Sequence, residues 1–112
     1  MDTRLAVDGT GNIYALAYFN QAVFIFNPEG RYVSRFGSMG NEEGQFTSPR
    51  SIAVDNLGRI FIADFPGLMM FSSDGRYLGT LTVDGAVMDI AFDDQNNLYL
   101  VAGKQVLRYR LK

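Results

Sequence analysis

The sequence predicts an all-β fold made of repeated units, each a small sheet of antiparallel strands. The main observation is a short apolar phrase ending in Asp, which occurs at residues 5–8, 52–55 and 90–93. Each copy is followed, after a turn, by a second apolar run rich in aromatic or β-branched residues. No stretch of the chain has convincing helical periodicity, so strands account for the whole pattern.

The spacing of the repeats narrows the fold class further. The three Asp residues, Asp8, Asp55 and Asp93, recur about every 40 to 50 positions, a period typical of propellers and solenoids. In such folds one unit cannot bury its apolar faces alone and must stack on its neighbours. The repeat therefore predicts a stack of β-sheets, and it says much less about function.

The first unit is expected to contain four strands, of which the second covers residues 13–17 and the third 23–26. Asp8 caps the turn before the second strand through its side chain, and Gly11 takes the left-handed conformation there. The Asn-Pro-Glu-Gly segment that ends at Gly30 forms the turn before the fourth strand.

The second unit repeats this order, and the third is shorter. Its turn has Asn96 in place of the glycine, and Asn is the next-best residue at positive φ. The chain ends during or just after the third strand of this unit, so we expect eleven strands in groups of four, four and three. A ring of carboxylates for a metal ion or acid–base chemistry is the other interpretation of Asp8, Asp55 and Asp93, but their fixed place at the start of each hairpin favours capping.

Composition argues against several classes of function. Ten Lys and Arg against twelve Asp and Glu give a net charge of −2, a poor match for nucleic-acid phosphates or an anionic membrane. With no Cys and no His, the chain lacks the main residues of thiolate, zinc and general-base chemistry. No apolar run approaches the ~20 residues that span a bilayer. We therefore expect no enzyme activity, no cofactor, no metal site, no nucleic-acid partner and no membrane partner.

A long ordered pattern in the middle of the chain identifies a family resemblance. Its residues are Phe36, Gly37, Ser38, Gly40, Gly44, Gln45, Phe46, Pro49, the segments 52–55 and 60–64, Gly58, and the segment 74–78. This pattern resembles the NHL repeat, a β-propeller blade. The third copy matches weakly, and the Asp that the family has after the second strand is kept as Asp64 but is Ala17 and Ala102 in the other copies.

The resemblance implies one propeller segment over residues 1–112, with blades at about 4–37 and 51–82 and a partial blade at about 88–112. NHL domains generally close as rings of about six blades, so three blades are half of a ring. A half ring leaves two apolar blade faces exposed, and we expect a homodimer to cover them by closing six blades. The alternative is an engineered chain or a piece of a longer propeller with a purely structural role.

Loop residues form the candidate binding site. In the NHL family the loops after the second and fourth strands share the face that often binds ligands. On these loops the chain has exposed aromatic and cationic candidates: Tyr18, Phe19, Arg50, Phe65, Pro66 and Lys104. Aromatic and Arg side chains are common interface anchors. The other interpretation is that these side chains only cover the edge of a blade.

A scaffold or binding module for a protein or peptide is the function that this site favours. An enzyme of the lyase or hydrolase type and an RNA-binding domain are the other functions that the family suggests. Lyases and hydrolases of this kind rely on His and carboxylate ligands, and RNA-binding members use a basic face, so the absence of His and the net acidity argue against both. Fold alone does not decide among them.

Overall fold

The computed structural model describes residues 3–17, 22–40, 42–65, 67–83 and 86–110. In these residues the chain forms eleven strands in three antiparallel sheets, ordered along the chain. The strands are β1 (Thr3–Val7), β2 (Ile13–Ala17), β3 (Ala22–Phe26), β4 (Tyr32–Phe36), β5 (Ser51–Val54), β6 (Ile60–Ala63), β7 (Gly67–Phe71), β8 (Tyr77–Thr82), β9 (Val87–Phe92), β10 (Asn97–Ala102) and β11 (Gln105–Arg110). The all-β fold and the grouping of four, four and three strands are confirmed.

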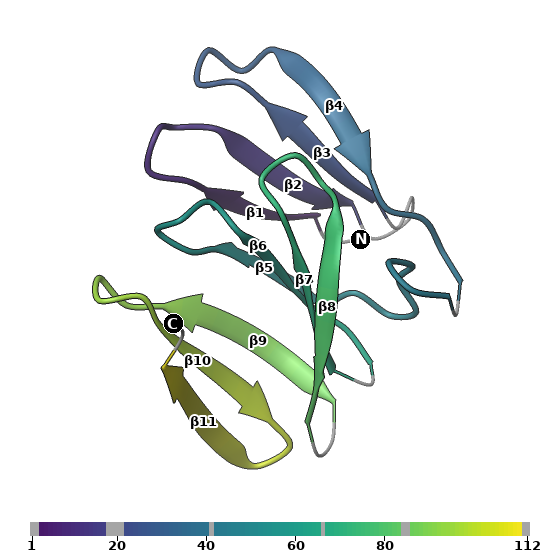
Figure 1. Ribbon diagram of the computed structural model, residues 1–112, viewed down its shortest axis with the longest axis vertical. Coiled ribbons are helices and arrows are strands. Elements are labelled where there is room, and N and C mark those ends of the chain that lie inside the picture. Colours follow the sequence, from purple (N-terminus) through teal and green to yellow (C-terminus); the bar gives the residue numbers. More distant parts are fainter. Residues whose placement is uncertain (1–2, 18–21, 41, 66, 84–85, 111–112) are drawn as a thin grey trace.

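The three sheets are stacked one after another from the top to the bottom of Figure 1. Each strand pairs with the next one along the chain. The first strands of the sheets, β1, β5 and β9, pack next to each other, as the innermost strands of neighbouring propeller blades do. We call the sheets blades 1, 2 and 3.

Aspartate caps the first turn of every blade, as the sequence indicates. Oδ1 of Asp8 accepts hydrogen bonds from the backbone N–H groups of Thr10 and Asn12, at 3.0 and 2.9 Å. Asp55 and Asp93 accept the corresponding pairs in blades 2 and 3. Asn96 has a φ of 66°, so it replaces the turn glycine in the left-handed conformation. Each of these carboxylates therefore holds its own hairpin.

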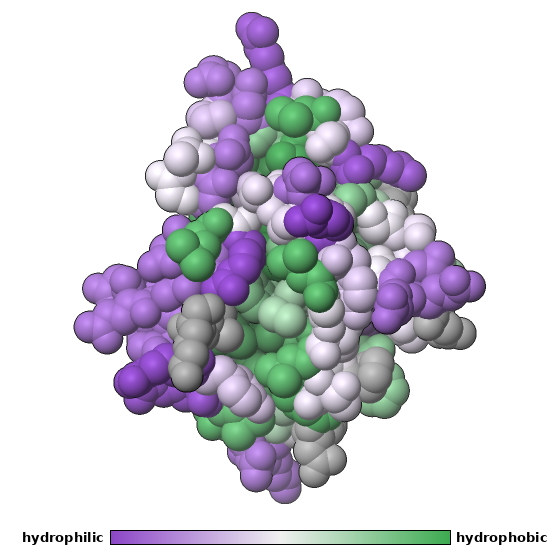
Figure 2. Space-filling model, in the orientation of Figure 1, coloured by the Kyte–Doolittle hydropathy of each residue, from purple (hydrophilic) through white to green (hydrophobic). Residues whose placement is uncertain are grey.

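Two apolar clusters lie between the blades. The first joins blades 1 and 2 and is centred on Tyr14, Leu16 and Ile60, and the second joins blades 2 and 3 around Phe61 and Leu98. Figure 2 shows apolar side chains gathered in the middle of one face of the molecule, with polar residues around them. Burial of the side chains in the two clusters is the main force that holds neighbouring sheets together.

The connection between β4 and β5 folds back into the first cluster. Phe46 is fully buried and its ring packs edge-on against Phe71, with 5.8 Å between centroids. Gly37 has a φ of +98°, and a Cβ there would clash with the Phe46 ring. Pro49 is buried as well. Phe46 and Pro49, which both belong to the repeat pattern, are therefore packing residues.

Candidate functional site

The strand connections gather at two opposite ends of the stacked blades (Figure 1). This follows from the antiparallel pairing, because every second connection returns to the same end. We call the end formed by the connections after β4, β6, β8 and β10 the loop face. The other end carries the capped turns.

The structure places three of the predicted site residues on the loop face. Arg50, Phe65 and Lys104 are all exposed there. The backbone N–H of Arg50 donates to the carbonyl of Ala63 at 2.9 Å, so Arg50 and Phe65 flank the same pair of strands, β5 and β6. Lys104 lies in the turn between β10 and β11, on the neighbouring blade. The other three predicted residues lie outside the described part of the chain: Tyr18, Phe19 and Pro66.

A pocket of about 290 Å³ opens beside Phe65 on blade 2. Its walls come from the β4–β5 connection, from the residues after β6, and from β7 and β8. The side chains that matter most for recognition are Glu42, Glu43, Asp64, Phe65, Met69 and Tyr77. Two aromatic rings and a thioether therefore face a rim with two exposed carboxylates.

Sequence reasoning missed most of this pocket. The sequence pattern gave Glu42, Glu43, Met69 and Tyr77 no part in the candidate site. The signal that could have found them is the length of the β4–β5 connection, since a long ordered loop in a compact domain is often functional. Its path over blade 2 depends on contacts far apart in sequence.

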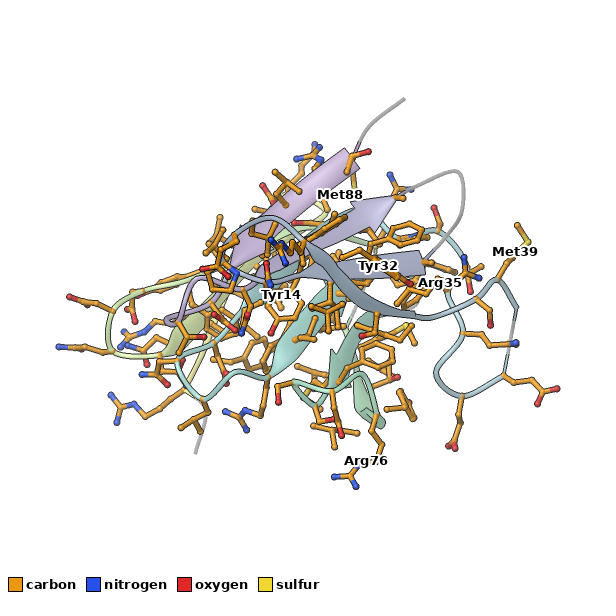
Figure 3. The ribbon with its side chains drawn as sticks, turned by 90° about the horizontal axis from the view of Figure 1, so that it is seen from above. Tyr14, Tyr32, Arg35, Met39, Arg76 and Met88 are labelled. Carbon is orange, nitrogen blue, oxygen red and sulfur yellow. The ribbon has the colours of Figure 1, made fainter. Side chains whose placement is uncertain are left out.

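The β4–β5 connection is held by its own hydrogen bonds. The Phe46 N–H donates to the Ser38 carbonyl at 2.7 Å, and the Gly40 N–H donates to the Phe46 carbonyl at 3.0 Å. The Gln45 side chain accepts from the Glu42 N–H and donates to the Ser38 hydroxyl, at 3.1 and 3.2 Å. Figure 3 shows this connection extending from the blades, with Met39 at its outer edge. The pocket thus has a preformed wall.

Asp64 fastens the same connection to blade 2. Its carboxylate is buried and accepts backbone N–H groups of Thr47 at 2.9 Å, Ser48 at 2.6 Å and Phe65 at 2.7 Å. Hydrogen bonds to an ionised acceptor are among the stronger ones in proteins. This carboxylate positions the pocket wall and the Phe65 backbone together. Its role gives a physical reason for keeping Asp at this position of blade 2.

The opposite end of the stack carries carboxylates with shifted acidity. Burial disfavours the ionised form of Asp8, but hydrogen bonds from Asn12, Thr10 and Tyr14 outweigh it and lower its pKa to about 2. Burial, followed by the hydrogen bond to Asp8, raises the pKa of Tyr14 to about 12. In blade 3 hydrogen bonds from Asn97, led by its backbone N–H, lower the pKa of Asp93 to about 2. These carboxylates stay ionised and bonded within their turns.

Blade 2 differs at this end. Arg59 takes the place of the turn Asn, and its Nε donates to Oδ2 of Asp55 at 2.7 Å. Asn56 of the same turn donates its N–H to the Asn96 side chain of blade 3 at 2.8 Å. The turns of blades 2 and 3 are therefore tied to each other.

Within the described ranges, no group of three or more His, Cys, Asp or Glu side chains is arranged to hold a metal ion. The described residues also contain no helix with the length and apolar character needed to cross a membrane.

Comparison with known families gives the classification of the chain. Residues 5–107 match a family described as a 6-bladed beta-propeller. The chain belongs to this six-bladed propeller family. Its three sheets are then a segment of such a ring, as expected from the repeat. No curated protein matches the sequence.

Solved structures of propellers resemble the chain. A gluconolactonase from Xanthomonas campestris is 22% identical with a TM-score of 0.75, over 93% of this chain and 35% of that one. A second protein, described as a putative gluconolactonase, is 17% identical with a TM-score of 0.75, over 96% and 38% of the two chains. BamB from Moraxella catarrhalis is 15% identical with a TM-score of 0.71, over 93% and 30%. The chain thus spans between 30% and 38% of the length of these structures, and likeness at this identity shows the fold alone.

The comparisons correct one expectation from the sequence. We expected no enzyme activity because the chain has no His and no Cys. The comparisons contradict that expectation. Two of the similar structures carry the name gluconolactonase, and both superpose on nearly the whole chain. Missing His and Cys residues in this segment therefore do not separate it from enzyme-bearing propellers.

Proposed function

We propose that the chain supplies NHL-like propeller blades whose loop face binds a protein or peptide partner through a basic side chain. The observation that carries the proposal is the pocket on blade 2, where Phe65 and Tyr77 stand beside Glu42 and Glu43. The predicted residues Tyr18, Phe19, Arg50, Pro66 and Lys104 belong to the same loop-face proposal as additional contacts.

The chemistry of the pocket favours a cationic group on an extended chain. Lys and Arg side chains have an apolar stem and a charged head, so the stem can lie on Met69 and the rings while the head reaches the carboxylates. A cation over an aromatic face gains roughly 0.5–2 kcal/mol, depending on its exposure. Because Phe46 and Asp64 hold the wall in place, little ordering is needed on binding.

A selection of short random peptides displayed on phage tests the proposal. Peptides retained by the chain are expected to share an Arg or Lys, and replacing that residue by Gln should weaken binding about tenfold or more, as measured by fluorescence polarisation. The Glu42→Gln, Glu43→Gln double variant should lose the preference for a basic residue. Enriched peptides without such a residue, or unchanged affinity in the double variant, would contradict the proposal.

A matched control separates the pocket from general surface effects. Leu57 is exposed, but it lies in the first turn of blade 2 at the opposite end from the loop face. The Phe65→Ser variant should weaken peptide binding, whereas Leu57→Ser should leave it unchanged. Equal losses in both variants would show that the peptides adhere to exposed apolar surface in general.

A further inference from the structure

The repeat allows each residue of one blade to be compared with its counterpart in the others. Leu5, Ile52 and Ile90 hold the same position in the first strand of blades 1, 2 and 3. Ile52 and Ile90 are 6% and 7% exposed, because each packs against the preceding blade. Leu5 is 64% exposed, because none of the three sheets of the structure packs on that side of blade 1. This open side of blade 1 also presents Val7, and Figure 3 looks down on this blade, with Tyr32 and Arg35 labelled.

Blade 3 packs on blade 2 by one side, and its other side is exposed. The third strands of the three blades have equivalent residues where they pair at the same register with the second strands: Val23, Leu68 and Val106. Val23 and Leu68 are fully buried, whereas Val106 is 70% exposed. A shallow hollow of about 110 Å³ lies on this side, lined by Ala91, Tyr99, Val101 and Val106 among others.

We propose that two copies of the chain join head to tail, so that blade 1 of each packs on blade 3 of the other and six blades close around a two-fold axis. Blades 2 and 3 each bury, against the preceding blade, the side that blade 1 leaves open. Blades 1 and 2 each bury, against the following blade, the side that blade 3 leaves open. The proposed contact between copies therefore joins the same two kinds of surface as the two contacts within the chain.

Charge supports the second copy as the occupant. The residue just before the repeated apolar phrase is Arg4 in blade 1, Ser51 in blade 2 and Asp89 in blade 3. Between blades 2 and 3 these positions touch, as the Ser51 hydroxyl donates to Oδ1 of Asp89 at 2.7 Å. In the proposed ring, blade 1 of the second copy follows blade 3 in the way that blade 3 follows blade 2. Arg4 of the second copy would then lie beside Asp89, as Asp89 lies beside Ser51.

The geometry of Asp89 leaves room for this ion pair. Both of the hydrogen bonds described for this carboxylate, from Ser51 and from the Ile90 N–H, end on Oδ1. Oδ2 can therefore accept from the guanidinium. Arg4 is exposed and lies at the start of the chain's first strand. Two such pairs would form, one at each of the two identical joins.

Charge exchange tests the pairing. Wild-type chain is expected to sediment with twice the mass of one chain at tens of micromolar. Arg4→Asp and Asp89→Arg should each weaken the dimer at least tenfold, because like charges then face each other at both joins. The double variant should recover most of the wild-type affinity. A monomeric wild type, a mass that keeps growing with concentration, or a double variant no better than the single ones would overturn the proposal.

A second variant covers the case in which Asp89→Arg fails to fold. Val106→Asp changes a side chain that is exposed in the single chain and buried in the ring, so it should give a folded monomer by circular dichroism. Leu57→Asp, which is equally exposed but lies on a turn, should remain dimeric. A dimer that survives Val106→Asp would contradict this join. The peptide pocket lies within blade 2 of one chain, so these results do not depend on peptide binding.

Discussion

Among single residues, the capping aspartates hold the first turn of each blade and give the chain a defined acid sensitivity. The pKa values of Asp8 and Asp93 are lowered from 3.8 to about 2 in the folded chain. A lowered pKa stabilises the folded state above the unfolded value, and this contribution is lost as the pH falls through the folded value.

We therefore expect the urea midpoint of unfolding to fall between about pH 4 and pH 2. In the Asp8→Asn, Asp93→Asn double variant the urea midpoint should fall less over this pH range, because Asn can still cap a turn but does not titrate. Asp94→Asn, which changes an exposed carboxylate in the blade 3 turn, serves as the control. If the urea midpoint of the double variant falls as much as that of the wild type, Asp8 and Asp93 do not cause the acid sensitivity.

Asp64 gives a prediction on both stability and binding. Asp64→Ala leaves three backbone N–H groups of the loop face without their acceptor, so we expect a loss of about 2–3 kcal/mol in the free energy of unfolding. Asp64→Asn keeps one carbonyl acceptor and should lose less. Denaturant titration of the three proteins measures the difference. If Asp64→Ala is as stable as wild type, these hydrogen bonds do not hold the loop.

The aromatic residues of the loop face give the third prediction. A double change of Tyr18 and Phe65 to Ser should leave the fold intact and weaken peptide binding by at least ~1–2 kcal/mol, as for hot-spot aromatics. Circular dichroism checks folding and fluorescence polarisation checks affinity. Unfolding of the double variant would show that these rings cover the blade edge. Normal binding by a folded variant would move the site to another surface.

For single strands and turns, the sequence is sufficient. Strands such as β2 and β6 are short runs of aromatic and β-branched residues bounded by turn residues, and the Asp–Gly or Asp–Asn spacing sets each first turn. These signals are local. The β4–β5 connection is different, because Phe46 packs on Phe71 and Thr47 bonds to Asp64, 17 positions away. The length of this connection indicates a functional loop, but the shape of the pocket could not be predicted because its wall depends on such distant contacts.

The fit between this connection and blade 1 can be tested at one glycine. Gly37→Ala would force an L side chain into a positive φ and bring its Cβ into a clash with the Phe46 ring, so we expect a loss of about 1–3 kcal/mol in the free energy of unfolding. Gly9→Ala is the matched control, because a Cβ there has no heavy atom within 4 Å. Thermal unfolding of both variants provides the comparison. Equal midpoints would show that the loop adapts without cost.

For the whole molecule, the proposed ring ties folding to association. If the open sides of blades 1 and 3 are buried by a second copy, only the folded chain can associate, and mass action then stabilises it. The melting temperature of the wild type should rise with protein concentration. That of Val106→Asp should be constant, as measured by scanning calorimetry at two concentrations. A wild-type melting temperature independent of concentration would argue against association.

The position of the pocket has a consequence for how a ring would bind. The pocket belongs to blade 2, the central blade of the three, so the two pockets of a two-copy ring stand three blades apart, on opposite sides of the axis. A ligand with two basic segments joined by a linker of suitable span would reach both at once. Its second binding step would then be intramolecular, and its avidity would exceed the affinity of either pocket without any new contact.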